Sequence, residues 1–213
     1  MKTDELIETL GTMVERVEGR SFRNAFIVAL VIGVALAVCA MQALLGTSTS
    51  ALRQSHVGLM ILTVVFVVGV VAAGSSYLLR AAHPGMAART PIALLVLLVL
   101  AFLCAGVAGI LAVDPATRSE MIFGPPWTIC VMCIPFFAIG PFIAFAWVLR
   151  QGAPTKLRAM GAVAGLVAGV IGAGACALHM PGPSLPFIGL WYTGPILICA
   201  LLGALLGPRV LRW

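Results

Sequence analysis

Charged side chains are scarce in this sequence. Only 9% of its 213 residues are Asp, Glu, Lys or Arg, whereas 62% are hydrophobic and the mean hydropathy is +1.13. Soluble domains carry about 25% charged residues, so the composition excludes a soluble globular domain and predicts an integral membrane protein. The net charge of +6 then does not indicate nucleic-acid binding, because each Lys and Arg has to be interpreted by its position relative to the membrane.

The long hydrophobic runs also lack charged residues near their middles. Charges inside a membrane are typical of ion and proton pathways, so their absence argues against a pump or a proton-coupled transporter. The sequence contains no Walker motif, no dinucleotide-binding glycine fingerprint and no HExxH zinc motif. No set of Ser, His and Asp falls on one side of the expected membrane. We therefore expect that the protein is not an enzyme.

Six hydrophobic runs are each close to the ~20 residues that cross a bilayer as a helix. They lie at Ala25–Leu45, Val57–Leu79, Ile92–Val113, Thr128–Leu149, Arg158–Leu178 and Phe187–Gly207. The sequence predicts an all-α membrane protein with two parts. Residues 24–213 form one bundle of six transmembrane helices, and residues 1–23 form a cytoplasmic arm with a short amphipathic helix.

Small residues and prolines mark two of these runs. Prolines should bend the helices that contain them. Pro135 and Pro141 lie in the fourth run, and Pro195 lies in the sixth. A helix face without side chains lets a neighbouring helix approach closely, so a glycine repeat in the fifth run predicts tight packing. That repeat consists of Gly161, Gly165, Gly169 and Gly172.

The basic residues fall mainly on one side of the expected membrane. Only Arg53 and Arg118 lie on the opposite side. The other eleven are Lys2, Arg16, Arg20, Arg23, Arg80, Arg89, Arg150, Lys156, Arg158, Arg209 and Arg212. Because cytoplasmic loops carry an excess of Lys and Arg, this pattern places both termini in the cytoplasm. Trp127, Trp191 and Tyr192 then fall near the outer interface, where an aromatic belt is expected.

The first 23 residues hold five of the seven acids: Asp4, Glu5, Glu8, Glu15 and Glu18. Thr3 can cap a helix, with Asp4 and Glu5 in its first turn. Apolar residues recur at helical spacing and form one stripe, made of Leu6, Ile7, Leu10, Met13, Val14 and Val17. So short a helix is marginal in isolation, and we expect it to order against a partner.

Four residues of types that can bind soft metal ions lie at similar depth near the expected outer surface. Cys130 and Cys133 begin the fourth run, and Cys176 and His179 end the fifth. Residues three apart share a helix face, so two facing helices would bring these ligands together for zinc or another soft metal ion. Alternatively, Cys130 forms a disulfide with Cys133 or Cys176 in an oxidising compartment, or the cysteines pack as small apolar residues.

Several stretches resemble one known family. The opening MKTDELIETL, the W-x-x-C at Trp127–Cys130, the central QGAPTKLRAMGAVAGLVAG and the closing FIGLWYTGPILICALLGALLGPRVLRW are similar to the NrsF family of bacterial inner-membrane anti-sigma factors. The resemblance covers nearly the whole chain. It implies that the protein binds an extracytoplasmic-function sigma factor, without contacting nucleic acid, and releases it under stress. An acidic amphipathic arm suits capture by a groove of such a partner.

The resemblance also implies a sensor. One sensing cysteine of the family follows the tryptophan and corresponds to Cys130. The other lies in an L-H-C stretch, which here reads Leu178–His179–Met180, so the second cysteine is absent. Cys133 or Cys176 would then substitute, or Met180 would serve as a thioether ligand, in sensing thiol oxidants or soft metals.

Two other functions fit parts of the sequence. A membrane thiol oxidoreductase would use Cys130 and Cys133 with a quinone, although no second cysteine pair lies in an outer loop to pass electrons on. A small transporter or channel for apolar molecules would need no charges in its spans.

Overall fold

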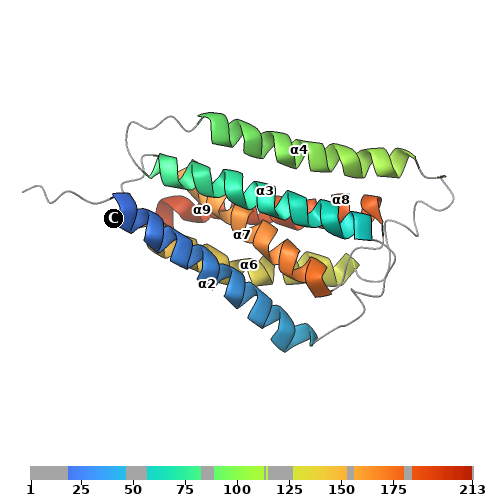
Figure 1. The fold of residues 1–213 in the computed structure, drawn as a ribbon, viewed down its shortest axis with the longest axis horizontal. Helices are drawn as coiled ribbons and strands as arrows, with labels where there is room; N and C mark the ends of the chain where they lie inside the picture. The colour runs from blue at the N-terminus through green and yellow to red at the C-terminus, as the bar shows by residue number, and fades with distance from the viewer. Residues whose placement is uncertain are drawn as a thin grey trace, which may run out of the picture.

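The computed structural model describes residues 19–46, 57–82, 89–112, 114, 127–152, 156–179 and 184–212, and helices joined by turns and bends make up this part of the chain. The helices lie side by side in one bundle (Figure 1). They are α2 (Gly19–Leu45), α3 (Val57–Ala81), α4 (Arg89–Leu111), α6 (Trp127–Leu149), α7 (Leu157–His179), α8 (Leu185–Trp191) and α9 (Thr193–Val210). The all-α prediction is confirmed for this part of the chain.

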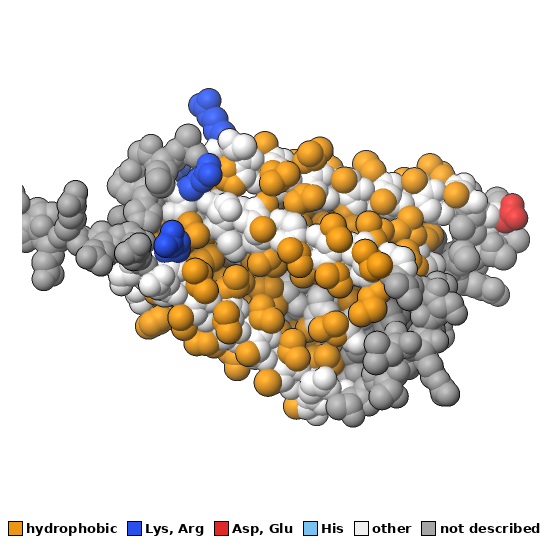
Figure 2. Space-filling model, viewed as in Figure 1, with side chains coloured by type: hydrophobic (Ala, Val, Ile, Leu, Met, Phe, Trp, Pro, Cys, Tyr) orange, Lys and Arg blue, Asp and Glu red, His pale blue; other side chains and the backbone are white. Residues whose placement is uncertain are grey.

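Six stretches of the described chain are long and apolar enough to cross a membrane, by length and composition. They are Ser21–Leu44, Gly58–Ala81, Arg89–Leu111, Trp127–Leu149, Leu157–Leu178 and Leu185–Val210, within a few residues of the six predicted runs. Large hydrophobic side chains cover the outward face (Figure 2), and many of them, such as Val65 and Leu205, are more than half exposed. An apolar surface of this extent is expected of a bundle that lies in lipid.

The most buried of the six spans is α7, which packs against α2, α3, α6 and α9. Its Gly- and Ala-rich sequence makes it thin enough for neighbours to approach on several sides. A Cβ atom at Gly161 or Gly165 would collide with carbonyl oxygens of Gly203 or Cys199 in α9. One at Gly172 would lie 2.6 Å from the carbonyl oxygen of Ile134 in α6. The prediction of tight packing along the glycine repeat is therefore confirmed.

α4 lies at the edge of the bundle and packs on α3 and α8 (Figure 1). Phe66 of α3 and Phe102 of α4 stack with ring centroids 4.0 Å apart. A Cβ atom at Gly106 would lie 2.7 Å from Cα of Gly189 in α8, so these two backbones also touch. Aromatic stacking and close contacts at glycines thus attach α4 to its neighbours.

The sixth run, predicted as Phe187–Gly207 with a bend at Pro195, consists of two helices that together form one candidate span, Leu185–Val210. α8 ends at Trp191, α9 begins at Thr193, and Tyr192 joins them. Pro195 explains the break, because it has no N–H to donate to the carbonyl of Trp191 and its ring clashes with that carbonyl. The bend expected at Pro195 therefore occurs one turn before it. α6, in contrast, continues through Pro135 and Pro141.

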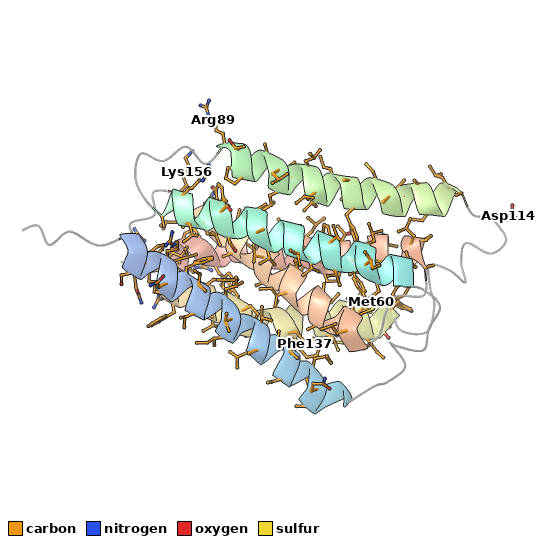
Figure 3. The ribbon with its side chains drawn as sticks, in the orientation of Figure 1. Met60, Arg89, Asp114, Phe137 and Lys156 are labelled. Carbon is orange, nitrogen blue, oxygen red and sulfur yellow. The ribbon has the colours of Figure 1, made fainter. Side chains whose placement is uncertain are left out.

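Opposite charges occupy opposite ends of the described bundle. The described Lys and Arg side chains all belong to helix termini at the end where α2 begins and the chain finishes: Arg23, Arg80, Arg89, Arg150, Lys156, Arg158, Arg209 and Arg212. Asp114, the acid in the described part, lies at the other end (Figures 2 and 3). We call these the basic end and, after the side of the membrane predicted for it from the sequence, the outer end. The side chains of Lys2, Arg16, Arg20, Arg53 and Arg118 lie outside the described residues.

Gly165→Ala should destabilise the protein, because the new Cβ would collide with the Cys199 carbonyl and force α7 away from α9. Overpacking of this kind costs about 1–3 kcal/mol, which would lower the midpoint of thermal unfolding in detergent. Gly58→Ala is the matched control, because a Cβ there has no atom within 4 Å. Equal midpoints for the two variants would contradict this account of the α7–α9 contact.

Candidate functional site

The contact between α6 and α7 brings two of the predicted sensor cysteines together at the outer end. Cys130 lies in the first turn of α6 and Cys176 in the last turn of α7, and their side chains are 1% and 2% exposed. Their thiols lie close enough to interact with each other electrostatically. Both are free thiols, as is the partly buried Cys133 one turn further along α6. Burial and proximity make Cys130 and Cys176 a pair.

The glycine repeat explains why these two cysteines meet. α6 and α7 run in opposite directions, and their backbones touch where Gly172 faces Ile134. Cys176 lies four residues after Gly172, and Cys130 lies four residues before Ile134. One helical turn from the contact toward the outer end therefore reaches a cysteine on each helix. The sequence placed both residues at this depth but left open which pair would form.

Tyr192, which joins α8 to α9, lies near this pair of cysteines. Tyr192 is 1% exposed and lies close enough to Cys130 and Cys176 to interact with them electrostatically. Tyr192 therefore lies at the predicted outer end, but its buried side chain is not exposed as a member of an aromatic belt would be, so that part of the prediction is wrong. Next to it, Thr193 is also buried, and its hydroxyl has no hydrogen-bond partner among the described residues.

Two tryptophans lie beside the thiol pair. Trp127 is three residues before Cys130 on the same face of α6, and its ring packs at a tilt against Trp191 of α8 with centroids 4.8 Å apart. Both side chains are partly exposed. The W-x-x-C spacing thus unites a tryptophan and a thiol on one helix face, and the α8–α9 break supplies the second tryptophan. We call Cys130, Cys176, Tyr192, Trp127 and Trp191 the outer cluster.

The predicted metal ligands do not all fall in the described part. His179 ends α7, but its side chain and Met180 lie outside it. Among the side chains that are described, no three His, Cys, Asp or Glu groups meet as metal ligands would. The predicted binding residues of the arm also lie outside: Thr3, Asp4, Glu5, Leu6, Ile7, Leu10, Met13, Val14 and Val17. Their roles stay predictions.

Comparison with known proteins agrees with the resemblance found in the sequence. The model of the NrsF family, described as negative regulator of sigma F, matches residues 10–213. The chain belongs to the NrsF family. The match includes the whole described bundle and every residue of the outer cluster.

Two relatives show how much of the sequence is shared with other members of the family. It is 35% identical to the probable anti-sigma-F factor NrsF of Azospira oryzae over the full length of both chains. It is 31% identical to the anti-sigma-F factor NrsF of Caulobacter vibrioides over 47% of each chain. No solved structure matches it. Both relatives bear the name of a regulator.

Mild oxidation of the purified protein should join Cys130 to Cys176. In this reaction the two thiols lose two electrons and two protons to an oxidant such as diamide, which is reduced to the hydrazine. Counting free thiols with a maleimide and identifying the cross-linked peptides by mass would measure the product. Cys176→Ala should abolish the cross-link, whereas Cys133→Ala should retain it. A Cys130–Cys133 disulfide in the wild-type chain would contradict the pairing.

Proposed function

We propose that this protein is a multi-pass membrane anti-sigma factor. It holds an extracytoplasmic-function sigma factor at the cytoplasmic face of the bacterial inner membrane and releases it when the thiols of the outer cluster react. The supporting observation is the full-length similarity to a relative that is named a probable anti-sigma-F factor. Names of this kind point to regulation rather than catalysis.

The orientation in this proposal rests on the basic end. An excess of Lys and Arg is typical of cytoplasmic ends of membrane helices, so the basic end faces the cytoplasm. α2 begins there at Gly19, which attaches residues 1–18 on that side. The arm, which we take as residues 1–23, is therefore in the compartment where a sigma factor would be found. The outer cluster faces the opposite compartment, where disulfides can persist.

The arm supplies the binding element. Its apolar stripe would insert into a groove of the sigma factor, while its five acids would pair with basic residues around that groove. Ordering upon binding offsets part of the binding free energy, which keeps the complex reversible. Such a complex withholds the sigma factor from RNA polymerase only while the arm is presented in the right position.

The packing of α7 links the outer cluster to the arm. A disulfide holds its sulfurs about 2 Å apart, closer than two hydrogen-bonded thiols, so oxidation would shift α6 against α7. α2 packs on both α6 and α7 and continues into the arm at the basic end. A rearrangement at the outer end would thus move the helix that carries the binding element. A soft metal ion at Cys130, Cys133, Cys176 and His179 would act through the same helices.

Leu10→Asp should abolish binding of the sigma factor, because it places a charge in the middle of the apolar stripe. Copurification from native membranes would show a sigma subunit with the wild-type chain and none with the variant. In cells that carry the variant, the target genes of the sigma factor would be transcribed without stress. Thr12→Asp is the control, because it adds the same charge on the opposite face of the predicted helix. Wild-type binding by Leu10→Asp would refute the role of the stripe.

Cys130→Ser should leave sigma-factor binding intact and abolish induction by thiol oxidants or soft metals. The serine hydroxyl preserves size but can form neither a disulfide nor a thiolate ligand. Transcription of the target genes after treatment with diamide or cadmium would measure the effect. Cys104→Ser, at an exposed position of α4, should respond as the wild type does. Normal induction in the Cys130 variant would remove this thiol from the mechanism.

A further inference from the structure

The eight described Lys and Arg side chains of the basic end have no acid beside them. All eight are exposed, and the guanidinium of Arg150 also donates to the carbonyl oxygen of Val210. The acid of the described part, Asp114, lies at the outer end, and Figure 3 labels it there opposite Arg89 and Lys156. Like charges gathered at one end repel one another, and an anion among them lowers that repulsion. The basic end therefore offers a surface to an anionic partner.

Several helix termini converge at this end around Gly152, which follows α6. A Cβ atom there would lie 3.3 Å from Cβ of Ala82 and 3.5 Å from the ring of Phe22, so the end of α3 and the start of α2 both touch it. α2 and α3 otherwise have little contact with each other, because α2 packs mainly on α6 and α3 mainly on α7. The contact at Gly152 brings together the termini that carry Arg23 and Arg80.

The ends of α6, α7 and α9 meet beside Arg150. Its bond to Val210 joins the end of α6 to the end of α9. A Cβ atom at Gly207 in α9 would lie 2.5 Å from the carbonyl oxygen of Leu157, where α7 begins. Four more basic residues lie within two residues of these contacts: Lys156, Arg158, Arg209 and Arg212. The basic side chains of five helices thus belong to one continuous surface.

Within this chain, the acids that can reach that surface belong to the arm. Five of the seven acids lie in residues 4–18. Asp114 is at the outer end, and Glu120 belongs to the segment that joins the outer ends of α4 and α6. Glu120 precedes Trp127 by seven residues, a reach of at most about 25 Å, whereas the 23 residues of α6 span about 34 Å.

The arm is attached at a suitable point and has a suitable length. It continues into α2 at Gly19, one turn before Phe22 and therefore close to the contact at Gly152. In the helix that their sequence predicts, residues 4–18 span about 22 Å, which is about two of the 8–10 Å spacings between packed helices. Such a helix reaches from α2 across α7 to α9, because α2 packs on α7 and α7 packs on α9.

The predicted helix has one strongly acidic face. Four acids lie opposite the apolar stripe, within about 80° of arc around the helix axis. They are Asp4, Glu8, Glu15 and Glu18. Anionic headgroups of an inner leaflet would repel this face, whereas the basic end attracts it. Single ion pairs at a surface are weak, but a tether holds the arm at an effective concentration in the millimolar range, which favours several weak pairs together.

We propose that the acidic face of the arm docks on the basic end of its own chain and that the basic end competes with the sigma factor for these acids. The competition rests on the proposed function, whereas the docking does not. While the arm is docked, its acids are occupied, so the sigma factor binds only after the arm has left the bundle. A thiol reaction that shifts α6 against α7 would also move the termini that hold the arm.

The test is zero-length cross-linking of the purified full-length chain, without sigma factor, in a nonionic detergent. A carbodiimide condenses a carboxylate with an amine to an amide and takes up the water to become a urea. The chain has two lysines, Lys2 in the arm and Lys156 at the basic end. Mass spectrometry of monomers should find Lys156 joined to an acid of residues 4–18. Lys156→Arg should lose this product, and Ala112→Lys in that background, exposed at the outer end, should not restore it.

Salt and charge variants test the cause of the docking. Raising NaCl to about 0.5 M should lower the Lys156 product at least fivefold, because salt screens the ion pairs. A product that joins Lys2 to Asp4 within the arm controls for the reagent. Arg158→Gln combined with Arg209→Gln should lower the Lys156 product to a similar extent; if this variant fails to fold, the salt dependence of the wild-type chain decides. A yield that salt leaves unchanged, or a product found only in dimers, would overturn the proposal.

The competition is measured with the sigma subunit that copurifies with the wild-type chain. It should bind at least threefold more tightly to the Arg158→Gln, Arg209→Gln variant, and adding it to the wild-type chain should suppress the Lys156 product. Weaker binding would mean that the basic end presents the arm to the sigma factor, which would overturn the competition. Failure of the wild-type chain to bind any sigma subunit refutes the anti-sigma role, whereas the cross-link still decides the docking.

Lipid headgroups are the other anions that the basic end can meet. The cross-linking is therefore repeated in bilayers of phosphatidylcholine alone and of phosphatidylcholine with phosphatidylglycerol. The Lys156 product should persist in both. Its loss in the bilayers that contain phosphatidylglycerol would assign the basic end to lipid phosphate and overturn the proposal.

Discussion

Backbone contact through α7 is the constraint on which the rest of the bundle depends. Gly161 and Gly165 place α7 against the backbone of α9, and Gly172 places it against α6. In a lipid environment helices gain little from burying apolar side chains, so association depends on close van der Waals packing of this kind. The same contact at Gly172 sets Cys176 beside Cys130, so the packing of the core and the geometry of the thiol pair have one cause.

The two ends of the bundle carry different chemistry, and α7 joins them. Its first turn lies among the basic side chains and its last turn carries Cys176. α2 packs on α6 and α7 and leads directly to the arm. Within the proposed function, this arrangement lets a thiol reaction on one side of a membrane alter the position of a binding segment on the other, without any polar pathway between them.

The sequence predicted the features that depend on local pattern. Run lengths identified six stretches that are long and apolar enough to cross a membrane, the four-residue glycine spacing identified the close helix contact, and its place in the fourth run put Cys130 near the predicted outer end. It did not predict which helices would be neighbours, so the Cys130–Cys176 pair and the separation of α2 from α3 emerged only in three dimensions. Tyr192 was assigned to an outer aromatic belt from its expected depth, whereas its side chain is buried beside the α8–α9 break. The residues of the arm are predicted to contact a partner protein, and a pattern within one chain does not identify that partner.

The separation of α2 from α3 has a consequence for how the bundle assembles. Synthesis begins at the N-terminus, so these two helices are made first, and they offer each other little contact surface. The scaffold that both require is α7, which emerges only after α4 and α6. α3 can pack on α4 as soon as α4 has been made, whereas α2 has no main partner before α6, so the native tertiary structure has to be completed after most of the polypeptide has been synthesised. Biogenesis of this protein accordingly depends on whatever shields unpaired segments during that interval.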